Sequence, residues 1–234
     1  MTTLLATLSD HLATVKQLLR LPVAHLVFDQ AIAPANVRST YRYYTKRHPV
    51  YKIIRHKTWG AALVDLGRFR NGHDYLDSIK GRNWGAHHIK RARARGYRLA
   101  EIERNDYVDA IFAINTSVAA RQGRPMDQKY LEKQQCFDKL VNFTYYGVLD
   151  QDDQLVAYAN VGRYGNFHAF EQLMGYRNND GIMHLLVGDI SAALVDQGLS
   201  RYLMYDTWFG ALPGLRQFKA MLGFTPYRAR YHLR

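Results

Sequence analysis

The segment near the C-terminus, residues 199–227 (LSRYLMYDTWFGALPGLRQFKAMLGFTPY), constrains the fold of this chain more than any other stretch. It begins with the pattern of a short strand, Arg201–Asp206, which is followed by a glycine-rich loop, Gly210–Gly214. A short helix, Leu215–Leu222, and a Gly-Phe-Thr-Pro turn then lead into a last strand. This ending predicts a mixed α/β domain whose sheet is completed by the final residues of the chain.

Upstream of this segment, the hydrophobic periodicity predicts alternating helices and strands. Before residue 97 we expect an amphipathic helix at 1–21, strands at 23–30, 50–55 and 61–66, and a helical stretch at 74–95 that Gly81 and Gly85 would interrupt. After it we expect a strand at 97–103, helices at 107–121 and 127–139 around a loop at 122–126, strands at 143–149, 155–161 and 166–174, and a helix at 181–197. Asn105 or Asp106 is expected to cap the helix at 107. The predicted order from residue 97 is β-α-α-β-β-β-α-β-α-β.

The composition limits the classes of protein to which the chain can belong. With 234 residues, of which 47% are hydrophobic, it is long enough for one substantial domain. The single cysteine, Cys136, excludes a disulfide framework and a multi-cysteine zinc site, and no histidine spacing indicates a metal. No run approaches the roughly 18 apolar residues of a membrane span, and no signal peptide is indicated. We therefore expect a cytoplasmic protein without a metal or a membrane partner.

The charge is unusual for such a domain. The chain has 32 Lys and Arg against 20 Asp and Glu, a formal net charge of +12, which favours polyanionic partners such as nucleic acid. Five basic residues in one short stretch are predicted to bind nucleic acid: Lys90, Arg91, Arg93, Arg95 and Arg98. The alternative is a solvated helix face. The basic and tyrosine-rich stretch Arg38–His48 also suits stacking on bases, or is an ordinary amphipathic surface.

Two motifs resemble those of a known superfamily. The segment Gly214-Leu215…Phe218-Lys219…Gly223-Phe224 resembles the C-terminal "GLxxFKxxFGF" of GNAT acyltransferases of the Fem-type branch, which take aminoacyl groups from tRNA. The stretch Arg82…Ile89–Tyr97 resembles the basic segment that precedes the first strand of their catalytic half. The resemblance implies an α/β (α+β) fold with a mixed, mostly antiparallel central sheet flanked by helices. It places a GNAT-like acyltransferase domain at 71–234, after an N-terminal helical and β extension or incomplete first half at 1–70.

The same resemblance implies where the acyl donor binds. In GNAT folds two central parallel strands splay apart, and the donor's phosphates meet the start of the following helix. Acetyl-CoA users have a glycine-rich loop there, whereas this chain has one glycine in the corresponding stretch, which favours aminoacyl-tRNA over acyl-CoA. No tightly bound cofactor is expected. The residues that we predict to bind the donor are Arg177, Asn178, Asn179, Gly181, His184 and Lys219, and Asp180 is expected to cap the helix.

Transfer to an amine requires a base and stabilisation of an oxyanion. Glu171, flanked by apolar residues in a strand, and Asp206, at a strand end, are the predicted bases, and Tyr205 is a predicted proton donor. The alternatives are a salt bridge from Glu171 to an arginine and a loop cap at Asp206. His168 is expected to point outward. Acceptor recognition, by a small amine or peptide, is assigned to Arg121, Arg124 and Trp208, although the two arginines suit an ordinary surface turn equally well.

Three functions remain open from the sequence. The first is an N-acyltransferase that uses aminoacyl-tRNA, and the second is an acyl-CoA-dependent enzyme of the same fold. The third is a nucleic-acid-binding or nucleic-acid-modifying protein on a GNAT-like scaffold. The motifs, the single-glycine loop and the net charge of +12 favour the first.

Overall fold

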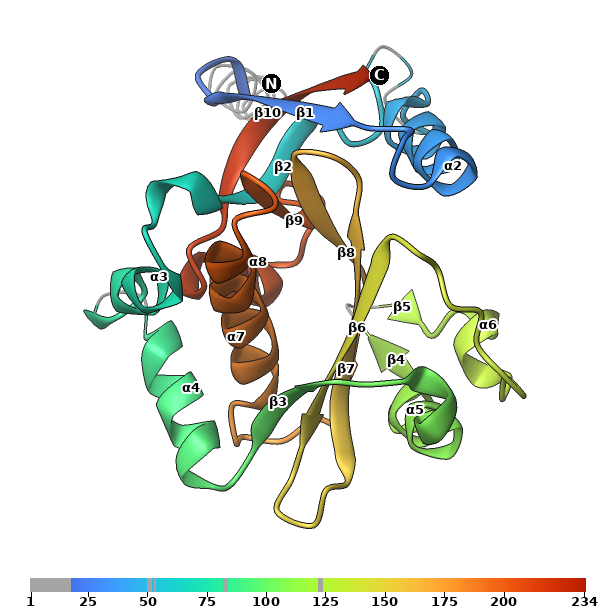
Figure 1. Cartoon of the computed structure of the whole chain (residues 1–234), viewed down its shortest axis with the longest axis vertical. Coiled ribbons are helices and arrows are strands. Elements are labelled where there is room, and N and C mark those ends of the chain that lie inside the picture. Colours follow the sequence, from blue (N-terminus) through green and yellow to red (C-terminus); the bar gives the residue numbers. More distant parts are fainter. Residues whose placement is uncertain (1–17, 50–51, 53, 82–83, 122–123) are drawn as a thin grey trace, which may run out of the picture.

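An eight-stranded sheet in the order β1-β10-β2-β9-β8-β7-β6-β3 forms the centre of the molecule (Figure 1). The computed structural model describes residues 18–49, 52, 54–81, 84–121 and 124–234. The strands of this sheet are β1 (Val23–Phe28), β2 (Trp59–Asp65), β3 (Arg98–Glu101), β6 (Phe143–Leu149), β7 (Leu155–Arg163), β8 (Phe167–Gly175), β9 (Tyr202–Thr207) and β10 (Thr225–Leu233). Among the described strands, only β1–β10 and β8–β9 are parallel pairs. The sheet is therefore mixed and mostly antiparallel, as predicted.

Helices cover both faces of the sheet (Figure 1). They are α2 (Pro34–Thr45), α3 (Gly72–Ser78), α4 (Gly85–Ala94), α5 (Val108–Thr116), α6 (Gln128–Leu131), α7 (Ile182–Gln197) and α8 (Pro213–Met221), with short 3-10 turns at η1 (Leu66–Arg68) and η3 (Arg104–Tyr107). A two-stranded hairpin, β4 (Ala120–Arg121) and β5 (Arg124–Pro125), precedes α6. The core against α7, α3 and α4 lies on one face, and the cores that include α2 and α5 residues lie on the other.

Helix α7 is buried on most of its circumference. It packs between the sheet and the α3–α4 pair, so that ten of its residues are buried, among them Leu185, Leu186 and Ile190. The helix ends at Gly198, whose φ of +65° is the left-handed conformation of a glycine stop. This central position explains why apolar residues occur around most of the helix instead of on one narrow face.

The first 70 residues contribute to the same sheet. β2 lies between β9 and β10, and β1 pairs with β10 on the outer side. The boundary predicted at residue 70 therefore falls between elements of one continuous sheet, with α2 packed on β1 and β10. The helix predicted at 1–21 lies mostly outside the described residues.

Several local predictions are wrong. The described residues of 50–55 form no strand, and the helix predicted at 127–139 is confined to α6. Asn105 does not cap α5, because its side chain instead bonds the backbone of Phe137. His168 points inward and is 6% exposed, because helices cover both faces of the sheet at β8. Burial lowers the pKa of His168 to about 4.

Candidate active site

The central parallel strands separate beyond their first three residue pairs. β8 and β9 are paired only through Phe167–Tyr202, His168–Leu203 and Ala169–Met204. From Phe170 onward β8 stays with β7, whereas β9 stays with β2. Helix α7 begins shortly after the end of β8. The fold thus contains the opening between two parallel strands that the resemblance predicts.

Glu171 lies at this opening on a β-bulge. Asn160 of β7 pairs with Gln172 and the next residue, Val161, pairs with Phe170, so that Glu171 has no partner across the ladder. A bulge turns the extra residue out of the normal alternation and is frequent beside active sites. Glu171 therefore has no backbone partner in the ladder with β7, and its carboxylate faces the side of the sheet that α2 covers.

One oxygen of Glu171 is anchored and the other is available. Oε1 accepts hydrogen bonds from the hydroxyls of Tyr44 and Tyr164, each at 2.9 Å. Burial, together with the negative charge of Glu171, raises the pKa of both tyrosines, so that they remain donors at neutral pH. Among the described residues, Oε2 has no hydrogen-bond partner and no arginine pairs with the carboxylate. This arrangement suits a general base better than a structural salt bridge.

Asp206 forms an ion pair across the end of the opening. Its carboxylate lies 3.0 Å from Lys57 Nζ, and the side chains are 58% and 12% exposed. Asp206 has φ +51°, a strained conformation for a residue with a Cβ. The surrounding protein raises its pKa by desolvation, but the positive charge and hydrogen bond of Lys57, followed by Lys219 and His56, outweigh this and lower the pKa. Trp208, just beyond the strand, packs against the core.

Lys219 lies beneath this pair and is 1% exposed. Its Nζ donates a hydrogen bond to the Thr207 carbonyl at 2.8 Å and lies 4.6 Å from the centre of the Tyr205 ring. Desolvation lowers the pKa of Lys219 to about 8, although Asp206 opposes the effect. In this conformation the positive charge of Lys219 acts on the site electrostatically, without contact, and lowers the pKa of Asp206. Contact with a donor phosphate would require the side chain to move.

Glu171, Tyr205 and Asp206 line one continuous cleft. A cavity with a volume of about 540 Å³ contains all three, together with Tyr43 and Lys57. A second cavity of about 450 Å³ continues it toward α5. The residues common to the two cavities are Lys129, Tyr130, Glu171 and Gln172. The predicted catalytic residues, which come from two strands, are thus brought to one accessible surface.

The β4–β5 hairpin borders this cleft. Arg121 and Arg124 are opposite each other in the hairpin, and Pro125 lines the cleft. The guanidinium of Arg177 donates a hydrogen bond to the Ala120 carbonyl at 3.0 Å. The two arginines predicted to bind the acceptor are therefore carried by a hairpin at the cleft, and Arg177, predicted to bind the donor, holds the base of that hairpin.

The start of α7 is enclosed by α4. Gly181 has φ +87°, and a Cβ there would lie 2.5 Å from the His88 carbonyl oxygen, which explains the glycine. The expectation that Asp180 caps the helix is wrong, because Gly181 holds the cap position. The Asp180 carboxylate instead accepts a hydrogen bond from the Tyr97 hydroxyl at 2.9 Å and pairs with Arg95. The Arg95 contact joins the turn before α7 to the C-terminal end of α4.

The other residues predicted near this turn have mixed environments. Asn178 accepts a hydrogen bond from the Asp180 backbone at 3.2 Å, and Asn179 is exposed. The His184 ring stacks on His88 with the ring centres 4.3 Å apart. Burial, followed by the neighbouring His88, lowers the pKa of His184 to about 4, so that His184 is neutral at physiological pH.

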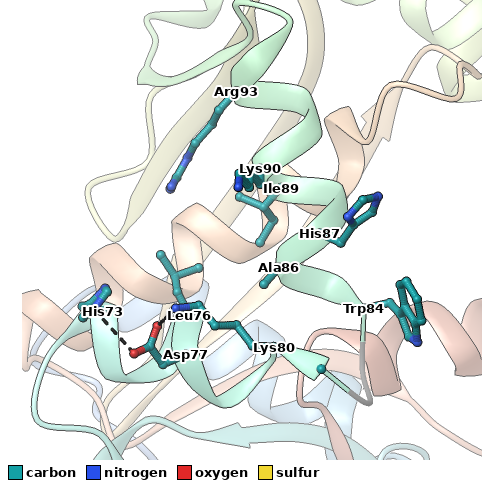
Figure 2. Close-up of a pocket in the computed structure, with 11 residues that line it drawn as sticks. His73, Leu76, Asp77, Lys80, Trp84, Ala86, His87, Ile89, Lys90 and Arg93 are labelled. Atoms are coloured by element: carbon teal, nitrogen blue, oxygen red, sulfur yellow. Dashed lines mark ion pairs between the residues drawn. The ribbon is translucent and has the colours of Figure 1, made fainter.

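Three of the five basic residues predicted to bind nucleic acid make ion pairs within the chain: Arg93 with Asp189, Arg95 with Asp180, and Arg98 with Asp153. Arg91 contacts a ring nitrogen of His88 at 3.3 Å. Lys90 lies on a groove between α3 and α4 (Figure 2). The assignment stays a prediction, but aspartates balance much of the charge of this stretch.

A groove between α3 and α4 has a volume of about 820 Å³ (Figure 2). Leu76 and Ile89 are among its apolar lining residues, and Trp84, 63% exposed, stands at one end. No residue of β8 or β9 lines it. The groove is therefore separate from the candidate site in spite of its size.

Lys57, Tyr44 and Tyr164 are absent from the sequence predictions. Tyr44 belongs to the tyrosine-rich stretch that suggested base stacking, but it is 1% exposed and supports Glu171 instead. Lys57 meets Asp206 only because β2 and β9 are neighbours in the sheet. No local pattern identifies either role.

The part of the chain that the structure describes contains no group of three or more histidine, cysteine, aspartate or glutamate side chains that could hold a metal ion. Within the same residues, no helix is both long and apolar enough to cross a membrane.

The opened sheet, with α7 after its central strand, defines a GNAT-like fold. No protein-family model matches the chain, and no curated protein sequence matches it. Among solved structures, FemX aligns with a TM-score of 0.55 and 10% identity over 72% of this chain and 59% of FemX.

The C-terminal domain of a putative lysylphosphatidylglycerol synthetase from Agrobacterium fabrum aligns with a TM-score of 0.49 and 16% identity, over 71% of this chain and 57% of that one. L-PGS from Bacillus licheniformis aligns with a TM-score of 0.47 and 14% identity, over 72% and 59% of the two chains. In each case the chain matches less than two thirds of the solved structure. The FemX alignment agrees with the GNAT and Fem-type fold that the motifs predict.

Proposed function

We propose that the protein is an N-acyltransferase that moves an aminoacyl group from tRNA to the amine of a small molecule or peptide. The observation that carries the proposal is Glu171, held on the β8 bulge at the opening between β8 and β9, with one oxygen anchored by tyrosines and the other available. The GNAT-like fold and the Fem-type motifs agree with it. A tRNA donor makes the cytoplasm the expected compartment, and no tightly bound cofactor is required.

The start of α7 supports tRNA over acyl-CoA as the donor. A CoA pyrophosphate would need close approach to the first backbone N–H groups of this helix. Gly181 and Ile182 are buried, the His88 carbonyl lies against Gly181, and the Asp180 carboxylate stands in front of the turn. Because Arg95 pairs with Asp180, it is the burial of these backbone groups that keeps a pyrophosphate away from the turn. A donor whose phosphates bind elsewhere avoids this conflict.

The reaction is an aminolysis of the aminoacyl ester. The acceptor nitrogen attacks the carbonyl carbon, a C–N bond forms, and the C–O bond to the terminal ribose of the tRNA breaks. Glu171 Oε2 takes the proton that the amine loses, and the ribose oxygen, which keeps the electron pair, takes a proton from Tyr205. The positive charges of Lys57 and Lys219 stabilise the oxyanion that forms in between.

The test is a transfer assay with purified protein, radiolabelled aminoacyl-tRNA and a panel of amines and short peptides. Parallel reactions contain acyl-CoA in place of the aminoacyl-tRNA. We expect an acylated amine from the tRNA donor in the wild type and not in Glu171→Gln, which keeps an oxygen for the two tyrosine hydroxyls. Product from acyl-CoA alone would refute aminoacyl-tRNA as the donor and identify acyl-CoA as the donor instead. No product from either donor, with folded protein, would refute it.

A further inference from the structure

The segment between Asp29 and Asp65 contains no acidic residue. It holds seven lysines and arginines: Arg38, Arg42, Lys46, Arg47, Lys52, Arg55 and Lys57. Most of the segment forms α2 and its connection to β2. A cationic stretch without acidic residues can be neutralised only by another part of the chain or by a partner.

Four side chains of this segment form what we call the α2–β2 patch: Tyr43, Lys46, Arg47 and Arg55. The backbones of Arg47 and Arg55 are joined by an isolated β-bridge, and the His56 backbone N–H bonds the Lys46 carbonyl at 2.8 Å. Lys46 Nζ lies 4.4 Å from the centre of the Tyr43 ring. The chain therefore folds back on itself and presents these charges around one half-exposed aromatic ring.

The patch differs from the α4 region in the balance of its charges. Among the described residues, Lys46, Arg47 and Arg55 are all exposed and none makes an ion pair. In and beside α3 and α4, by contrast, aspartates pair with five of the basic residues: Arg70, Lys80, Arg93, Arg95 and Arg98. Cations without partners attract phosphates more strongly, because no internal ion pair must be broken first.

The α2–β2 patch also adjoins the candidate active site. Tyr43 lines the cleft that contains Glu171 and Asp206. Lys57 Nζ lies 5.4 Å from the centre of the same Tyr43 ring and pairs with Asp206. If a polyanion binds the patch, the part of it next to Tyr43 therefore lies at the mouth of the cleft.

We propose that the α2–β2 patch is the RNA-binding surface of the protein, with phosphates at Lys46, Arg47 and Arg55 and a base or ribose on Tyr43. The proposal rests on the proposed function for the identity of the RNA as the acyl donor, but the binding itself does not require transfer. An aromatic side chain among cations is the usual platform for an unpaired nucleotide. Tyr43 is the only large exposed apolar side chain of the described patch region, which disfavours insertion into a membrane.

The experiment is a filter-binding titration of the full chain against uncharged total tRNA over a salt series. One variant carries Lys46→Ala, Arg47→Ala and Arg55→Ala, and the matched control carries Arg68→Ala, Arg70→Ala and Lys80→Ala, which remove three exposed side chains that pair with aspartates. Each variant loses three positive charges, so that both have a net charge of +9 instead of +12. Circular dichroism confirms that both are folded, and vesicles with and without anionic lipid serve as a second probe.

We expect the patch variant to bind tRNA roughly 10²-fold more weakly at 0.1 M salt. Its slope of log affinity against log salt should be smaller by about 2 to 3, since each phosphate contact contributes about 0.7 to 0.9. Tyr43→Ala, added to the patch variant, should weaken tRNA binding further but leave the slope of log affinity against log salt unchanged, because it removes no charge. The control should retain most of the affinity of the wild type.

Equal losses in the two variants would overturn the proposal, because net charge alone would then explain binding. Patch-dependent binding to anionic vesicles, without binding to tRNA, would overturn the assignment to RNA. Patch-dependent tRNA binding in a protein that transfers no acyl group would support this inference and refute the proposed function.

Discussion

Lys219 should destabilise the fold in a pH-dependent way, and replacing it with methionine should reveal the cost. Methionine keeps a flexible apolar stem of similar length, but it removes the charge. The pKa of Lys219 is lowered by burial from 10.5 to about 8. A difference of about 2.5 between the two pKa values corresponds to roughly 3 kcal/mol of folding free energy.

The direction of the pH dependence follows from proton binding. Below pH 8 the lysine is protonated in both states, and the folded state bears the whole cost of the buried charge. Between pH 8 and 10.5 the folded protein loses the proton while the unfolded chain keeps it, so that the cost falls as the pH rises. Above 10.5 both states are neutral. The Thr207 carbonyl, which accepts a hydrogen bond from Nζ, loses its partner in the variant at a cost of about 1 to 2 kcal/mol.

At pH 7 we therefore expect Lys219→Met to be more stable than the wild type by about 1 to 2 kcal/mol. Near pH 10 the advantage should disappear or reverse. The assay is urea unfolding of both proteins at pH 7, 8.5 and 10, compared as differences in the free energy of unfolding. The exposed Leu212→Met is the control, because neither side chain titrates and its difference from the wild type should therefore not change with pH. A constant difference for Lys219→Met would refute the reasoning.

Three further predictions concern the site and the helix that supports it. Glu171→Gln should lower turnover by about 10²- to 10⁴-fold without a change in melting temperature, and Asp206→Asn should also lower turnover. Steady-state kinetics and thermal melts check both variants. Wild-type rates would remove these residues from the mechanism. Gly181→Ala should lower the free energy of unfolding by about 1 to 3 kcal/mol in urea titrations, because its Cβ would clash with the His88 carbonyl at a positive φ; an unchanged value would mean that the backbone shifts freely. The lowered pKa of His184 should make stability fall with acidification from pH 6.5 toward 4, because the unfolded chain binds the proton more tightly, and His184→Leu should reduce that fall in melts at each pH.

The order of elements could be predicted because each signal was local. The Gly-Phe turn at Gly223 marks the junction of α8 and β10, and Gly198 marks the end of α7. The stripe of apolar residues that predicts α7, which includes Leu185, Leu186 and Ile190, likewise requires no knowledge of its partners. Such signals depend on backbone preference and burial alone, so that the GNAT-like sheet could be inferred before its register was known.

The arrangement of the site depended on contacts between distant segments. The bulge at Glu171 arises from the register of β7 against β8, which no residue in either strand specifies by itself. His168 was assigned to the wrong face because alternation assumes one solvated face, whereas helices cover both faces here. The ion pairs that balance Arg93 and Arg98 likewise join residues far apart in sequence. Residue identity and sequence spacing alone therefore could not predict the bulge, the burial of His168 or these ion pairs.

The place of β10 in the sheet has a consequence for synthesis on the ribosome. β10 lies between β1 and β2, so that β1 has no partner in the sheet, and β2 lacks one of its two partners, until β10 has emerged. Until then both present unpaired strand edges, and a message truncated before β10 would yield a product that keeps them. We expect such products to aggregate or to be degraded, which makes the nine residues of β10 a checkpoint for assembly of the sheet.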